Sequence, residues 1–427
     1  MKRAKYFNFR LLAVLLAGIM LLAVFAGCGK KTDDAPATIR LGFVLPVTGP
    51  YAPFTESFQW VLDMALPVMN ADGGFYIKEY DKRIPVEIII ADSESDPTKA
   101  SEAAQKLVTT DNVHILVGAW TPETTIPVSI VAETNSLPAL MYDSPMEVWL
   151  EGGPYEWSHS IMFSLVNLME SYIDAWDKVD SNKKVGFIFG NDIDGVAFAG
   201  LAQEFCDRRG YNVVDPGRFP PGTSDYSSLI NMFKQEDCDI VLANSITPDY
   251  VTFFQQFYQL DFMPKVLTVG KGIHFESNAM AIGSAELANG LTTGLPWDRA
   301  YPWSSSLLGM STTELCDKWE ADHPGLPYHS SIAYDLSCLE VLTVLLNTAQ
   351  TLDREALKNA FPTLTGDTIY GPINFVDNNV FECAYVISQY VLGEKFPLEK
   401  NLVAHGKFTQ IPESTKPIVI MNERNIG

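Results

Sequence analysis

The chain has 427 residues, with 30 lysine and arginine residues against 52 aspartate and glutamate residues, for a formal net charge of −22. This acidic balance argues against nucleic acid and anionic lipid surfaces as partners, because both are negatively charged. The length exceeds what one ordinary hydrophobic core organises, and it predicts two lobes.

The N-terminal segment has the pattern of an export signal. Basic residues within 1–10 precede an apolar run at 11–26, which is short for a membrane-spanning helix of ~20 residues. The end of this run, Ala26-Gly27-Cys28, resembles a bacterial lipobox, and the resemblance implies lipidation of Cys28. An ordinary signal peptide with an incidental cysteine is the alternative. We expect a signal peptide over 1–27 and a polar, lipid-anchored tether over 28–37.

Strands and helices alternate over the first part of the chain. Short apolar runs are typical of buried parallel strands, and helical spacing of apolar residues follows them. A stretch with two glycines at 71–74 ends the first helix. The expected strands are 39–45, 84–91, 113–118 and 137–141, and the expected helices lie within 54–70, 97–110 and 121–135.

The same alternation starts again about 145 residues later. Strands that alternate with helices form parallel sheets with right-handed crossovers, so two such series predict two similar α/β lobes. A long helix at 331–350 must dock on one of them. The expected strands are 184–190, 211–219, 238–244 and 265–270, and the expected helices are 196–209, 226–235 and 248–260.

Several segments resemble the leucine/isoleucine/valine-type periplasmic binding proteins, the substrate-binding components of bacterial ABC importers. The resemblance is carried by IRLGFVLPVTGPYA, MNADGG, IIIADSESDPTKASEAAQKLV, VHILVGAWTPETT and IYGPINFVDNN. It implies an α/β fold of two Rossmann-like lobes with parallel sheets, joined by three crossovers, the type I periplasmic binding fold. Lobe one would comprise 38–160 and 292–374, and lobe two 161–291 and 375–427.

The resemblance also indicates where a ligand would bind. Amino-acid-binding members place hydroxyl residues after the third and fourth strands, and an acidic residue after the fourth strand of lobe two holds the ligand ammonium. The corresponding segments here contain Thr121, then Tyr142 and Asp143, and then Lys271. A lysine repels an ammonium group by about 1 to several kcal/mol at short range, so an amino acid is the less expected ligand.

Aromatic residues in the loops after the strands suggest a ligand with a planar or cyclic part. Lys271 would then meet a carboxylate or carbonyl group, and aspartates a hydroxyl or NH group. Each residue also has a purely structural interpretation: tryptophans pack in cores, a lysine is solvated, and Asp192 and Asp194 cap a helix. The candidate ligand-binding residues are Tyr51, Trp120, Thr121, Tyr142, Asp143, Asp192, Asp194, Thr247, Lys271 and Trp297.

The sequence lacks the common motifs of hydrolases, metalloproteases and nucleotide-binding enzymes. We therefore expect a non-enzymatic solute-binding protein without cofactor or metal, a monomer attached to the outside of the cell membrane by its lipid alone. It would bind a small-molecule ligand by closing its two lobes and deliver it to an ABC permease with its ATPase subunits. Two alternatives remain: a ligand sensor for a signalling receptor, and an exported enzyme.

Overall fold

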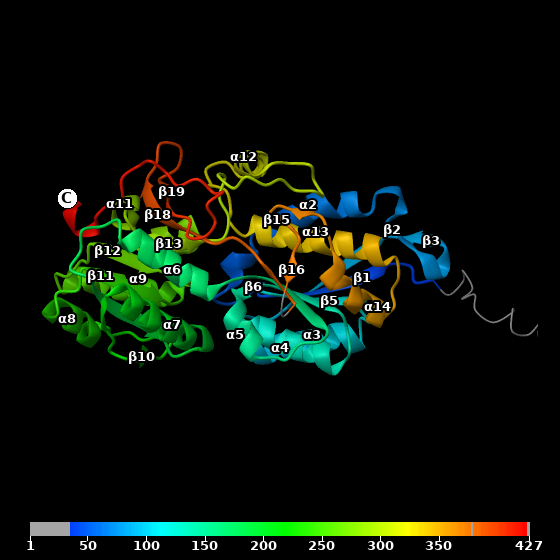
Figure 1. Ribbon diagram of the computed structural model, residues 1–427, viewed down its shortest axis with the longest axis horizontal. Coiled ribbons are helices and arrows are strands. Elements are labelled where there is room, and N and C mark those ends of the chain that lie inside the picture. Colours follow the sequence, from blue (N-terminus) through cyan, green and yellow to red (C-terminus); the bar gives the residue numbers. More distant parts are fainter. Residues whose placement is uncertain (1–34, 377–378, 425–427) are drawn as a thin grey trace, which may run out of the picture.

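The computed structural model describes residues 35–376 and 379–424, and it has two lobes side by side, each built around a sheet (Figure 1). The predicted signal peptide, the lipidation site Cys28 and most of the predicted tether lie outside the described residues.

The first sheet has seven strands, and all neighbouring pairs except one are parallel. In spatial order these are β16 (Phe375–Val376), β17 (Val380–Glu382), β7 (Ser158–Phe163), β6 (Ala139–Pro145), β5 (Ile115–Ala119), β1 (Ile39–Leu45) and β4 (Val86–Asp92). β1 occupies the residues that its apolar run predicted. Its side chains are almost all buried because helices cover both faces of the sheet.

The helices over the first sheet form two layers. On one face lie α3 (Pro97–Thr109), α4 (Pro122–Thr134) and α5 (Met146–Glu151), and on the other lie α2 (Phe58–Met69) and α13 (Ile332–Ala349) (Figure 1). α13 is long and apolar enough to cross a membrane, but 72% of it is buried inside the protein, where it packs against α2 and α14 (Arg354–Ala360). It is therefore a core helix of the first lobe.

The second sheet has eight strands and repeats the plan. In spatial order its path is β10 (Arg218–Phe219), β8 (Lys184–Gly190), β11 (Ile240–Asn244), β12 (Val266–Val269), β13 (Thr292–Leu295), β18 (Val386–Leu392) and β19 (Leu398–Ala404), and β9 (Asn212–Val214) also pairs with β8. Its helices are α6 (Leu165–Trp176), α7 (Ile193–Arg209), α8 (Ser227–Gln235), α9 (Thr247–Gln259), α10 (Glu276–Met280) and α11 (Ala285–Ala288). Only β18 and β19 run antiparallel to their neighbours.

The chain passes between the two sheets three times, as predicted. It crosses after β7, after β13 and after β17. The lobe boundaries expected at 291/292 and 374/375 differ from this: β13 hydrogen-bonds to β12 in the second sheet, and β16 and β17 join the first. Strands this short carry little periodicity, so only their pairing assigns them to a sheet.

Several smaller elements also differ from the sequence prediction. The strand expected at 211–219 is two short strands, β9 and β10, and β7 and α6 were not predicted. The remaining elements are the hairpin β2 (Phe75–Ile77) with β3 (Lys82–Ile84), the hairpin β14 (Asp367–Thr368) with β15 (Gly371–Pro372), and α12 (Thr312–Asp322). Five cysteines of the described chain are buried and free.

Candidate functional site

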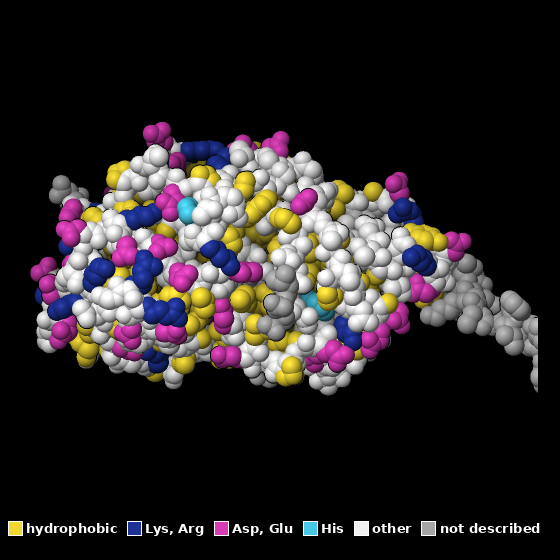
Figure 2. Space-filling model, viewed as in Figure 1, with side chains coloured by type: hydrophobic (Ala, Val, Ile, Leu, Met, Phe, Trp, Pro, Cys, Tyr) yellow, Lys and Arg dark blue, Asp and Glu magenta, His cyan; other side chains and the backbone are white. Residues whose placement is uncertain are grey.

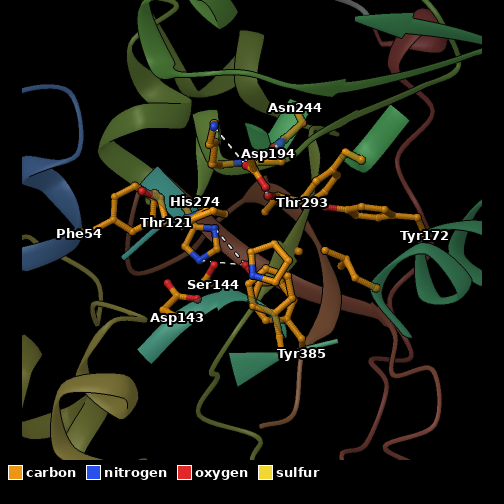
Figure 3. A pocket seen from close by; sticks show the side chains of 18 residues that line it. Phe54, Thr121, Asp143, Ser144, Tyr172, Asp194, Asn244, His274, Thr293 and Tyr385 are labelled. Carbon is orange, nitrogen blue, oxygen red and sulfur yellow. Dashed lines mark hydrogen bonds and ion pairs between the residues drawn. The ribbon is translucent and has the colours of Figure 1, made fainter. Parts of the chain in front are cut away.

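A pocket lies between the carboxyl ends of the two sheets. Parallel sheets bind ligands at this edge. Thr121 follows β5, and Asp143 and Ser144 belong to the end of β6; Asp194 begins α7, and Lys271 follows β12. Figure 3 shows Asp143 and Ser144 on the opposite side of the pocket from Asp194 and Asn244. Each lobe therefore contributes polar groups to one enclosed space.

The hydroxyl groups from the first lobe are buried and unpaired. Neither Thr121 Oγ1 nor Ser144 Oγ has a hydrogen-bond partner among residues 35–376 and 379–424. A buried hydroxyl without a partner costs about 1–3 kcal/mol, so both atoms are suited to a ligand that pairs with them.

The backbone at this place is strained. Trp120 and Thr121 both have φ of 64°, and Asp143 has φ of 55°. A bulky or β-branched residue rarely adopts positive φ, and such residues cost of order 1–3 kcal/mol each and cluster at functional sites.

Asp143 is a buried carboxyl group that holds its proton. Burial raises the pKa of Asp143 to about 8, and the nearby charge of Asp194 adds to this rise. A hydrogen bond with Tyr334 lowers the pKa but does not outweigh the burial. Behind it, Asp335 accepts hydrogen bonds from Ser57 (2.6 Å) and Tyr142 (3.1 Å), and burial raises its pKa to about 8 as well. Near neutral pH these carboxyl groups are largely protonated, so Asp143 can donate a hydrogen bond to a ligand.

Lys271 lies at the centre of a buried acidic cluster. Its Nζ is 3.1 Å from Asp194 Oδ2 and 3.5 Å from Asp192 Oδ2. Burial lowers the pKa of Lys271, but Asp194, Glu123 and other negative groups outweigh it, and the pKa is raised well above its ordinary value. Asp194 Oδ1 and both carboxylate oxygens of Glu123 lack hydrogen-bond partners in the described part of the chain. Three carboxyl groups thus surround one ammonium.

An aromatic wall encloses the rest of the pocket. It is formed by Phe54, Phe163, Tyr172, Phe198 and Tyr385, with His274 between them. Burial lowers the pKa of His274 to about 3, so its ring is neutral, and it lies 3.4 Å from the hydroxyl of Tyr385 (Figure 3). The pocket therefore has an apolar body with polar groups at its two ends.

The structure brings four of the ten predicted residues into the pocket lining: Thr121, Asp143, Asp194 and Lys271. Asp192 lies beside them, pairs with Lys271 and accepts a hydrogen bond from Gly195 N at the start of α7. This contact is the helix cap that was the structural alternative for Asp192.

The predicted aromatic wall uses other residues than those we expected. Trp120 is fully buried behind Phe54, with ring centroids 5.3 Å apart, and Tyr142 is buried and bonded to Asp335. Tyr51 is buried and does not line the pocket, although the centroid of its ring lies 5.9 Å from Lys271 Nζ.

Two further candidates lie away from the pocket lining. Trp297 is fully buried and packs edge-on against Tyr328, and Thr247 uses its hydroxyl to donate a hydrogen bond to Gly272 O. Lys271 is also not free to meet a ligand carboxylate as we expected, because Asp192 and Asp194 already neutralise it.

Sequence reasoning missed Ser144, Glu123, Tyr172, His274 and Tyr385. Ser144 and Glu123 were visible as polar residues directly after strands. Tyr172 and Tyr385 follow two of the crossings between the lobes, which no periodicity marked. His274 follows β12, and nothing in the sequence around it marks it as a pocket residue.

Comparisons with known proteins agree with this geometry. A sequence model of the periplasmic binding protein family matches residues 38–390. The Leu/Ile/Val-binding protein homolog 7 of Brucella melitensis is 25% identical over 278 residues, which cover 63% of this chain and 66% of that protein, slightly less than two thirds of its length.

Solved structures share the fold. The leucine-binding protein LivK of Thermotoga maritima superposes with a TM-score of 0.72 and 17% identity, over 86% of this chain and 99% of that one. A solute-binding protein of an ABC transporter from Rhodopseudomonas palustris, in complex with 3,4-dihydroxybenzoic acid, superposes with a TM-score of 0.67 and 16% identity, over 88% and 100% of the two chains. The chain belongs to the periplasmic binding protein family and has its type I fold.

Proposed function

We propose that the protein captures a small organic solute in the pocket between its lobes and delivers it to an ABC permease and its ATPase subunits. The observation that carries this proposal is the set of unpaired polar atoms from both lobes that face one aromatic-walled pocket. A ligand that bridges the lobes stabilises their closed arrangement by its higher affinity for that state.

The ligand is a carboxylate-bearing molecule with an aromatic, cyclic or branched apolar part. Its carboxylate accepts hydrogen bonds from Thr121 and Ser144 and from the protonated Asp143, while its body packs on Tyr172 and Tyr385. Charge-assisted hydrogen bonds of this kind are about twice as strong as neutral ones. The bound dihydroxybenzoic acid of the Rhodopseudomonas palustris structure has the same two parts.

A ligand that also carries an ammonium group is the second candidate. Lys271 argued against it in the sequence, but the lysine faces Asp192, Asp194 and Glu123, so this end of the pocket is acidic overall. An ammonium group beside Asp194 Oδ1 and Glu123 gives these unpaired oxygens a partner. An amino acid with an apolar side chain therefore remains compatible with the site.

The family supports a location outside the cytoplasm. We propose that the lipid on Cys28 is the anchor and that the protein acts as a monomer. Transport is favoured over catalysis, because the polar groups that line the pocket suit the holding of a solute and, among the residues that the structure describes, none of them is a nucleophile paired with a base. A sensor would hold its solute in the same way, so gene neighbours distinguish transport from sensing. Genes for permeases and ATPases beside this one would support transport, and a neighbouring receptor kinase gene would support sensing.

The ligand can be identified directly. Protein purified under native conditions is denatured, and the released small molecules are identified by mass spectrometry. Calorimetry then compares wild type with a Thr121→Val, Ser144→Ala double variant and with Trp297→Phe as a buried control outside the pocket. We expect the double variant to lose at least tenfold in affinity and the control to bind like wild type. Equal affinity of all three proteins would remove this pocket from the proposed function.

A further inference from the structure

A second cavity lies between the lobes, on the side of the β18–β19 hairpin. We call it the hinge cavity; its cavity volume is about 320 Å³. The second lobe contributes the hairpin, which lies beside α12 in Figure 1, and the start of α10. The first lobe contributes α12 and the segment before α13. It shares no lining residue with the pocket described above.

Every carboxylate of the hinge cavity already has a partner. Glu320 pairs with Arg299 (2.9 Å) and with Lys395. Asp298 accepts hydrogen bonds from the hydroxyl of Tyr328 and from Ala300 N.

The two remaining acids bond to backbone groups. Glu276 accepts a hydrogen bond from Leu398 N (3.2 Å), and Glu399 accepts hydrogen bonds from Glu394 N and Lys395 N. The negative charges of the wall are thus held in place by local contacts.

Lys400 is the exception among the charged groups. Its Nζ lies 4.5 Å from the centroid of the Tyr328 ring, and it forms neither an ion pair nor a hydrogen bond with any residue that the structure describes. Arg299 and Lys395, the other two cations of the wall, are both paired with acids. Burial lowers the pKa of Lys400, and the nearby groups Asp298, Cys316 and Glu276, none of which forms an ion pair with it, oppose the lowering.

Next to Lys400 the wall is aromatic and apolar. Tyr328, Tyr390, Phe396 and Leu398 line the cavity, and the hydroxyl of Tyr390 is already used as a donor to Ile273 O. These side chains present ring faces and carbon atoms to the space beside the free ammonium, an arrangement suited to a flat apolar group with one acceptor end.

We propose that the hinge cavity is a second binding site, for a monocarboxylate with a flat apolar part, whose carboxylate pairs with Lys400. Four acidic and three basic side chains line the cavity, so its net charge is one negative. Of the three cations, only Lys400 lacks an ion pair in the described part of the chain, so a single carboxylate can pair with it, whereas a phosphate dianion is repelled more strongly by the acids, which already outnumber the basic groups. Because residues of both lobes line the cavity, a ligand there favours the closed lobes.

The test uses benzoate as the probe and the full chain. Unmodified protein is treated with limiting acetic anhydride, and acetylation of each lysine is measured by peptide mass spectrometry. We expect benzoate to lower acetylation of Lys400 at least threefold and to leave the exposed Lys416 unchanged. Phosphate at equal ionic strength should protect neither lysine. Equal labelling of Lys400 with and without benzoate overturns the proposal, as does equal protection by phosphate.

Two sets of variants separate this site from the first pocket. In the Thr121→Val, Ser144→Ala variant, benzoate should still protect Lys400 from acetylation, whether or not the first pocket still binds its solute. A loss of this protection in the variant would show that the first pocket causes it. Titration of 4-fluorobenzoate, followed by ¹⁹F NMR, should show a bound component that weakens at least tenfold in Lys400→Met and less than threefold in Lys400→Arg. Wild-type binding by Lys400→Met would contradict the proposal.

Discussion

The substitution Lys271→Met tests whether the ammonium of Lys271 neutralises the buried acids of the pocket. Methionine keeps most of the volume of the side chain and removes the charge. Asp192, Asp194 and Glu123 then face one another with no cation between them. In the wild-type protein the lost Nζ lies 3.1 Å from Asp194 and 3.5 Å from Asp192. We expect the variant to be substantially less stable than wild type.

The magnitude follows from these distances and from burial. At an effective dielectric of about 20, each contact represents roughly 5 kcal/mol of attraction, and desolvation of the charges opposes it by several kcal/mol. Removing one partner of a buried pair leaves the other charge uncompensated and costs about 3–5 kcal/mol. The side chains of Lys271 and Asp194 are 9% and 7% exposed, so solvent screens this pair weakly.

The assay is urea unfolding at pH 7, followed by tryptophan fluorescence, with Lys416→Met as the exposed control. We expect Lys271→Met to lower the free energy of unfolding by about 3–5 kcal/mol and the control to change it by less than about 0.5 kcal/mol. Adding Asp194→Asn to Lys271→Met should restore at least about 2 kcal/mol. A cost below about 1 kcal/mol for Lys271→Met, or a double variant no more stable than the single one, would refute the reasoning.

Three other changes test the pocket. Thr121→Gly removes the backbone strain at φ 64° and a buried hydroxyl without a partner. The free energy of unfolding should therefore rise by about 1 kcal/mol, while the affinity for the co-purified solute should fall. A loss of stability in urea unfolding would contradict this expectation. Gly294→Ala places a Cβ 2.4 Å from the ring of Tyr385. The free energy of unfolding should therefore fall by about 1–3 kcal/mol, and the solute should bind more weakly. An unchanged midpoint of urea unfolding would argue against that contact. Stability should also fall as pH rises from about 4 to 8, because Asp143 and Asp335, with pKa values of about 8, keep protons that the unfolded chain releases near 4. Each carboxyl group contributes up to about 1.4 kcal/mol per pH unit, and the slope should become shallower in Asp143→Asn; an identical slope would show that the residue is ionised.

Local patterns in the sequence determined most of the strands and helices. The apolar runs at 39–45 and 184–190 are β1 and β8 with the predicted bounds, because a strand covered on both faces requires apolar residues along its whole length. Among the residues that follow strands, the structure places Thr121, Asp143, Asp194 and Lys271 in the lining of the pocket. The carboxyl ends of the strands in a parallel sheet lie at the same edge of the sheet, regardless of the sequences of the loops that follow them.

Only the tertiary structure decided which of these residues line the pocket and what charge their surroundings have. Lys271, read alone, repels an ammonium group, but Asp192 and Asp194 come from a different loop and reverse the sign of its surroundings. The aromatic wall likewise uses Tyr172 and Tyr385, near the crossings between lobes, instead of Trp120 and Trp297, which the core buries. Burial, side-chain direction and charge balance depend on contacts between segments far apart in the chain, and a single sequence does not contain them.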